Sequence, residues 1–130
     1  MNRGNSLINI SAKENIEKND FIEKINEFAE KLDFIDIQIL RKFYMTGKPF
    51  PNDTQPYCFP LLYKEMKTSN RLKIGMEALR KRVNRLVELE LLEKIKHSNP
   101  TSYKPIREKV EFVRGIILKF FILNGLTKFL

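Results

Sequence analysis

Basic and amide side chains gather on one face of a predicted helix that spans about residues 75–89. Lysine and arginine neutralise phosphates and release counterions, while arginine and asparagine form paired hydrogen bonds with guanine and adenine respectively. Each such base contact discriminates by about 1–3 kcal/mol. The candidate residues on or beside this face are Glu77, Arg80, Lys81, Asn84 and Arg85. These residue types in this pattern predict contacts with the phosphates and bases of a nucleic acid.

A short β-hairpin is predicted directly after this helix. Residues 91–96 alternate as a strand, the Ser-Asn-Pro-Thr sequence at 98–101 is typical of a turn, and residues 103–106 form a return strand. Pro105 indicates that the return strand lies at a sheet edge. Small polar residues at a tip, with lysines on the arms, suit contacts with phosphates. The candidate residues of the hairpin are Lys94, Lys96, His97, Ser98, Asn99, Thr101 and Lys104.

The elements that position these side chains follow from hydrophobic periodicity. The basic helix has an apolar seam opposite its basic face, made of Leu79, Val83, Leu86 and Val87. Upstream, Asp33 is a predicted N-cap of a helix that ends at Gly47, and a short helix is predicted from about Pro60 to Met66. Residues 46–56 contain three prolines and predict a loop. A helix, a turn, a basic helix and a hairpin in this order predict a mainly α (α+β) fold, a winged helix-turn-helix with N- and C-terminal helices.

The chain divides into four predicted parts. Residues 1–10 show no periodicity and are expected to be disordered. Residues 11–31 form a predicted N-terminal helix that opens with a capping box at Ser11. Residues 32–109 form the predicted winged-helix domain, and residues 110–130 form a C-terminal helix.

The C-terminal helix is strongly apolar, and a helix that is apolar on most sides is expected to be buried. Glu111, Arg114 and Lys119 interrupt it, so membrane association is not expected. We expect this helix and the N-terminal helix to form the interface of a homodimer. The alternative is that the C-terminal helix covers the core of the monomer itself. The predicted dimer interface comprises Ile22, Ile25, Phe28, Val113, Ile116, Ile117, Phe120 and Phe121.

The placement of charge favours a polyanionic partner. The net charge of the chain is +8, and residues 58–109 alone hold 13 Lys/Arg and 6 Asp/Glu. A lysine-rich soluble protein without such a partner is the alternative. A single cysteine, Cys58, forms no internal disulfide, and the polar N-terminus lacks the apolar core of a secretory signal, so a cytoplasmic protein is expected.

The sequence argues against an enzyme. It has no glycine-rich phosphate loop, no cluster with metal-ligand spacing and no nucleophile motif. No catalytic residue, metal site or cofactor is therefore predicted.

Two segments resemble known DNA-binding proteins. LDFIDIQIL (residues 32–40) resembles the opening helix of Lrp-type and related archaeal regulators. EALRKRVNRLVELELLEKIKHSNPTSYKPI (residues 77–106) is similar to the recognition helix and wing of small archaeal winged-helix transcription regulators. The terminal helices are also similar to those of MarR-type dimers, which pair across a two-fold axis.

This resemblance, over about residues 32–106, implies a homodimeric, sequence-specific regulator of transcription that binds double-stranded DNA. The helix at 75–89 would lie in the major groove and the wing at 91–106 on the backbone. The alternative is a winged-helix protein–protein interaction module with an acidic partner. The chain departs from the family in having Glu90 where glycine usually ends the helix, and no Lrp-type ligand-sensing domain follows the wing.

Overall fold

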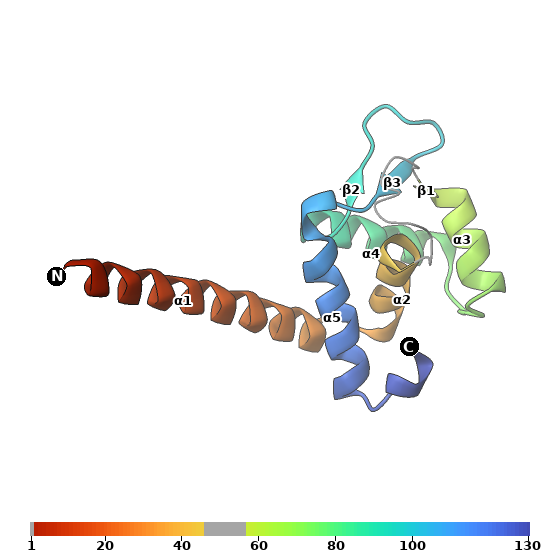
Figure 1. Ribbon diagram of the computed structural model, residues 1–130. Helices are drawn as coiled ribbons and strands as arrows, with labels where there is room; N and C mark the ends of the chain where they lie inside the picture. Colours follow the sequence, from red (N-terminus) through yellow and green to blue (C-terminus); the bar gives the residue numbers. More distant parts are fainter. Residues whose placement is uncertain (1, 46–56) are drawn as a thin grey trace.

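The computed structural model describes residues 2–45 and 57–130, with side chains from residue 17 onward. These residues form a mainly α fold with one small antiparallel sheet, as predicted (Figure 1). In chain order the elements are α1 (Asn2–Lys31), α2 (Phe34–Tyr44), β1 (Tyr57–Cys58), α3 (Phe59–Thr68), α4 (Met76–Glu88), β2 (Glu93–Lys94), β3 (Ser102–Lys104), η1 (Arg107–Lys109), α5 (Val110–Leu123) and η2 (Thr127–Phe129). The predicted loop at 46–56, with the predicted helix end at Gly47, lies outside the described residues.

Helix α1 begins earlier than predicted. It runs from Asn2, so residues 2–10, which were expected to be disordered, continue the same helix. No proline occurs between residues 2 and 31, and the helix passes through Ser11, where a capping box was predicted to start it. Figure 1 shows α1 extending away from the other elements, with its C-terminal end against α5.

The predicted N-cap of α2 is confirmed. The Asp33 carboxylate accepts a hydrogen bond from the Asp36 backbone N–H at 3.0 Å, and the Asp36 carboxylate accepts one from the Asp33 N–H at 3.2 Å. This reciprocal capping box satisfies two backbone donors at the start of α2. Such a cap stabilises a helix by about 1 kcal/mol.

The hydrophobic core lies where the helices α2 to α5 meet the sheet. It includes Leu40 of α2, Leu62 of α3, Leu79 of α4 and Ile117 of α5, each with no exposed surface. A fully buried aliphatic side chain of this size contributes about 1.5–3 kcal/mol to folding. The core therefore fixes α4 against both its neighbouring helices and the sheet.

The α5 residues that were predicted to form a dimer interface belong instead to the core of the single chain. Helix α5 packs against α1 and α2, which covers the face that was expected to meet a second subunit. The residues of the predicted interface that lie in this core are Val113, Ile116, Ile117, Phe120 and Phe121. Ile25 and Phe28 of α1 pack against it, and only Ile22 stays largely exposed, at 53%. The alternative, that the C-terminal helix covers the monomer core, is the arrangement observed.

Phe112 and Gly115 of α5 form the contact with α1. The Phe112 ring lies 5.6 Å from that of Phe21 and 5.8 Å from that of Phe28, measured between centroids. A Cβ added at Gly115 would lie 2.8 Å from Cδ1 of Ile25, so glycine lets the two helices approach closely. None of the described helices is both long and apolar enough to cross a membrane.

The sheet contains a third strand, β1, that the sequence did not predict. The order of the strands in the sheet therefore differs from that of the predicted two-stranded hairpin. The strand order is β1-β3-β2, with Tyr103 of β3 opposite both Tyr57 of β1 and Lys94 of β2. The return strand β3 is therefore central, and its prediction as an edge strand is wrong. Pro105 follows the last residue of β3, so its missing N–H does not interrupt either ladder.

Glu90 adopts the left-handed conformation that glycine favours, with φ of +60°. The Leu91 N–H donates to the Leu86 carbonyl at 2.9 Å and the Glu90 N–H donates to the Val87 carbonyl at 3.0 Å. These two bonds are those of a Schellman motif at the end of α4. The Lys109 ammonium donates to the Glu90 carbonyl at 2.9 Å and lies 3.5 Å from its carboxylate. Helix α4 therefore ends in the left-handed C-cap geometry that glycine favours, although the residue is Glu90.

The strain at Glu90 predicts that Glu90→Gly is more stable than Glu90→Ala by about 1 kcal/mol, because only glycine adopts this conformation without a Cβ clash. Both variants lose the carboxylate, so their difference isolates the backbone effect. Urea denaturation of the two variants measures it. Equal unfolding free energies would contradict the strained conformation of this residue.

Candidate nucleic-acid interface

Helix α4 carries the candidate base-reading residues because it is amphipathic. Leu79, Val83 and Leu86 are fully buried on its inner face. The seam fixes the rotation of the helix, so residues about half a turn away from it must face solvent. Glu77, Arg80, Lys81, Asn84 and Arg85, the five predicted contact residues, are all exposed.

Two of these five residues are bound to each other. The Arg80 guanidinium donates to the Glu77 carboxylate at 2.8 Å and also lies over the Phe59 ring, 4.8 Å from its centroid. Phe59 begins α3 and is buried, so Arg80 is held along the flank of α4. Within the part of the chain that the structure describes, Lys81 and Arg85 have no acidic partner. These two residues are the cations that α4 leaves available for phosphates or bases.

Asn84 is held by a residue that the sequence analysis did not select. The Tyr103 hydroxyl donates to Oδ1 of Asn84 across 3.1 Å. Tyr103 is only 2% exposed and sits at the centre of the sheet, and burial raises the pKa of its phenol. The hydrogen bond therefore ties the exposed face of α4 directly to β3.

The hairpin presents some of its predicted residues to solvent. Lys94, Lys96, His97 and Asn99 are exposed, and the two lysines have no acidic partner among the described residues. His97 has a positive φ of 60° at the tip. These four of the seven predicted hairpin residues are accessible to a ligand.

The other three predicted hairpin residues have contacts within the protein. The Ser98 hydroxyl donates to the Ile95 carbonyl at 3.0 Å and accepts from the Ser102 N–H at 2.9 Å, which closes the loop. Thr101 is half-buried and its carbonyl accepts from the Phe59 N–H. The half-buried Lys104 lies 3.8 Å from the Glu93 carboxylate. The alternation of the sequence could not show that these side chains hold the hairpin together.

Arg82 links α4 to the capping box of α2. Its guanidinium donates to the carboxylates of both Asp33 and Asp36, the latter at 3.4 Å. Asp36 is 1% exposed, and its burial, with the nearby Asp33 charge, raises the pKa of this carboxyl. Burial alone would also raise the pKa of Asp33, but hydrogen bonds from Arg82 and from the Asp36 N–H hold it below its ordinary value. The network fixes the position of α4 relative to α2, and no sequence pattern joined these three residues.

These opposite shifts predict opposite pH effects of Asp36→Asn and Asp33→Asn. The raised pKa of Asp36 means that its charge lowers stability once pH rises above the ordinary value of 3.8. The free energy of unfolding gained by removing that charge is therefore expected to grow as the pH rises above 3.8. The lowered pKa of Asp33 means that its charge stabilises above 3.8 and that this contribution is lost in more acidic solution.

Urea denaturation of both variants between about pH 3 and pH 7 tests these signs. The stability of Asp36→Asn relative to the parent protein should rise with pH, and that of Asp33→Asn should fall. Parallel pH profiles for the two variants would contradict the network as described.

Tyr44 of α2 supports both ends of the hairpin. Its hydroxyl donates to the Leu91 carbonyl at 2.7 Å and accepts from the Ile106 N–H at 2.9 Å. The side chain has no exposed surface, and burial raises the pKa of Tyr44 to about 12. Leu91 precedes β2 and Ile106 follows β3, so one hydroxyl holds the two chain segments at the base of the hairpin.

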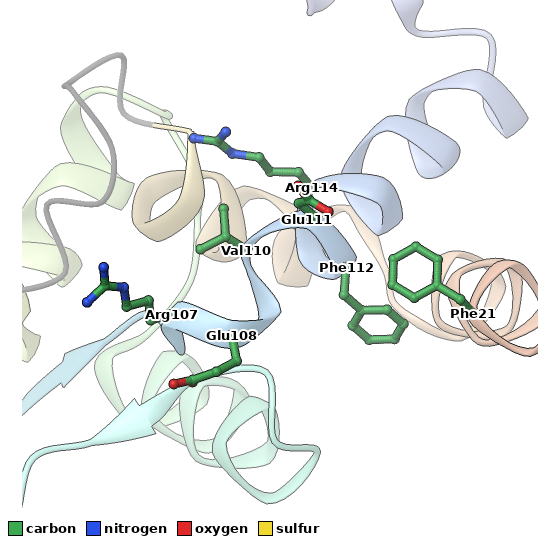
Figure 2. A pocket seen from close by; sticks show the side chains of 7 residues that line it. All are labelled: Phe21, Arg107, Glu108, Val110, Glu111, Phe112 and Arg114. Carbon is green, nitrogen blue, oxygen red and sulfur yellow. The ribbon is translucent and has the colours of Figure 1, made fainter. Parts of the chain in front are cut away.

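A cavity of about 430 Å³ lies where α1 and η1 meet the start of α5 (Figure 2). Its lining residues are Phe21, Arg107, Glu108, Val110, Glu111, Phe112 and Arg114. Figure 2 shows that the charged ends of Arg107, Glu108 and Arg114 lie apart from one another. Arg114 also donates to the Tyr44 carbonyl at 2.9 Å. The cavity therefore lacks the convergent polar groups of a small-molecule site.

The residues described here include no group of three or more His, Cys, Asp or Glu placed to hold a metal ion. The most coherent site is the exposed face of α4 with the neighbouring hairpin. Comparison with known proteins gives no identification, since no protein-family model and no curated protein matches the chain.

Proposed function

We propose that this protein is a winged-helix regulator of transcription that binds double-stranded DNA sequence-specifically. Helix α4 would lie in the major groove and the β2–β3 hairpin would contact the adjacent backbone. Lys81, Asn84 and Arg85 are the proposed groove residues. Lys94 and Lys96 are the proposed phosphate contacts of the hairpin.

The order of the elements supports the fold part of this proposal. A helix (α2), a short strand (β1), two helices (α3 and α4) and a hairpin (β2 and β3) follow one another, with β3 between β1 and β2. This order is consistent with a winged helix-turn-helix domain, in which the second helix of the pair would read the major groove. Helices α1 and α5 would be additions to that domain.

The observation that carries the proposal is a set of four exposed cations on α4 and the hairpin. Lys81, Arg85, Lys94 and Lys96 have no acidic partner among the described residues. Exposed lysine and arginine bind phosphates by releasing counterions, and adjacent elements presenting them suit a continuous backbone. The charge excess in residues 58–109 is consistent with this use.

A protein–protein interaction module with an acidic partner is the second candidate. The observation in its favour is that Glu77 and Glu88 are exposed on α4 with Lys81. Carboxylates on that face repel phosphates, whereas a protein partner could neutralise both signs of charge. The two candidates differ in whether duplex DNA alone is bound.

Fluorescence anisotropy with a random-sequence duplex tests the proposal. On a random-sequence duplex, where no base is selected, neutralisation of phosphates by all four cations predicts a slope of about −3.6 in a plot of log K against log salt, measured between about 50 and 300 mM salt. Enrichment from a pool of random duplexes then tests sequence preference. Absence of duplex binding at about 50 mM salt would contradict the proposal and favour the protein-interaction module.

Lys96→Ala is expected to weaken binding to all duplexes alike and to reduce the magnitude of the salt slope by about 1, because one phosphate contact is lost. Lys104→Ala is the matched control: Lys104 is half-buried beside Glu93, so its removal should change the slope less. The same anisotropy titration measures both variants. An equal slope change in the two variants would place the backbone contact elsewhere on the hairpin.

A further inference from the structure

The hydrogen bond between Tyr103 and Asn84 fixes which end of the Asn84 amide is available. A carboxamide is planar, and its oxygen and NH₂ group are two separate arms of one trigonal carbon. Oδ1 of Asn84 faces the Tyr103 hydroxyl at 3.1 Å, so the Nδ2 group is directed away from that hydroxyl. Because Asn84 is exposed, this NH₂ group is available to solvent or to a ligand.

The direction of this hydrogen bond follows from the position of Tyr103. Its ring is buried in the central strand of the sheet, with strands on both sides, so it has little freedom to turn. A phenolic O–H directed out of a buried site needs an acceptor, since an unsatisfied donor costs about 1–3 kcal/mol. Oδ1 of Asn84 is the acceptor to which this hydroxyl donates in the structure. A flipped amide would leave the phenolic hydrogen without that partner.

We propose that Tyr103 is a positioning residue that makes Asn84 a hydrogen-bond donor to the DNA, so that Asn84 selects guanine instead of adenine. This inference rests on the proposed function. Paired recognition of adenine requires an asparagine to accept from N6 with its oxygen while it donates to N7. In this protein one of the two lone pairs of the oxygen accepts from Tyr103 and the oxygen faces that side chain, whereas both N–H donors are directed away from it. Guanine presents two acceptors, N7 and O6, on its major-groove edge, which matches them.

The alternative target of the two donors is a phosphate oxygen, which would carry no base information. The two cases differ in one measurable property. A contact with guanine gives a base preference that depends on Asn84, whereas a contact with phosphate gives only affinity.

The experiment compares parent protein, Asn84→Ala and Tyr103→Phe in selections from a pool of random duplexes, with sequencing of the bound fraction. The position read by Asn84 is the one whose preference disappears in Asn84→Ala. We expect guanine there in the parent, favoured by about tenfold over adenine. Tyr103→Phe removes only the hydroxyl, so it should lower that ratio to about one or reverse it. Its salt slope with a random duplex should stay unchanged.

Three outcomes would overturn the inference while leaving DNA binding intact. They are adenine at the Asn84-dependent position of the parent, no Asn84-dependent position at all, and an unchanged guanine preference in Tyr103→Phe. The first two need only the parent and Asn84→Ala, so they decide the matter even where Tyr103→Phe is too unstable to measure. Failure of the parent to bind any duplex would instead contradict the proposed function itself.

Discussion

Replacing Lys81 and Arg85 by glutamate is expected to reduce affinity for duplex DNA by about a hundredfold or more while leaving the fold intact. Each charge-assisted hydrogen bond contributes about 1.5–3 kcal/mol, and glutamate adds repulsion to the loss of two of them. Both residues are exposed and neither has an acidic partner among the described residues, so the protein core is not altered. Anisotropy at fixed low salt measures the change, and circular dichroism checks the fold.

The matched control is Lys18→Glu with Lys24→Glu on α1. Both residues are exposed, and the double variant changes the net charge by the same amount. Figure 1 shows α1 extending away from α4 and the hairpin, so this control should bind DNA nearly as the parent does. An equal loss in the two double variants would mean that net charge, and not the face of α4, drives binding.

Tyr44→Phe is expected to lower the free energy of unfolding by about 2–4 kcal/mol. The variant keeps the ring but leaves the Leu91 carbonyl and the Ile106 N–H without their partner, each at a cost of about 1–3 kcal/mol. For a domain of this size the melting temperature should fall by about 8–16 °C. Thermal and urea denaturation give both quantities.

Tyr63→Phe is the control for removal of a hydroxyl. The Tyr63 hydroxyl accepts from Lys67 at 3.1 Å on the surface, where water can replace it, so a change of less than about 0.5 kcal/mol is expected. If Tyr44→Phe were as mild as this control, the Tyr44 hydroxyl would not hold the base of the hairpin. The variant should also bind DNA more weakly, because Tyr44 positions the hairpin that carries Lys94 and Lys96.

The sequence alone predicted the helices at the centre of the chain because their signals are local. Asp33 at an N-cap needs only its own neighbours, and the seam of Leu79, Val83 and Leu86 needs only a period of 3.6 residues. The exposure of Lys81, Asn84 and Arg85 followed from the same period. These features come from chain segments of a few turns, which is the range over which periodicity and capping act.

The tertiary structure decided how these elements use their side chains. Val113 and Phe121 were predicted to face a second subunit, but periodicity reports only that a face is buried and not what buries it. Strand β1 contains two residues, too few to show alternation, and without it β3 could not be recognised as central.

In the candidate site, too, some features follow from the sequence and others only from the tertiary structure. The sequence determined which residue types line the exposed face of α4, because helix period and composition suffice for that. Only the fold decided which of them are free, since Tyr103 reaches Asn84 across 19 positions and Arg82 reaches Asp33 across 49. Contacts between side chains so far apart along the chain leave no local pattern, because they exist only once the core has brought α2, α4 and the sheet together.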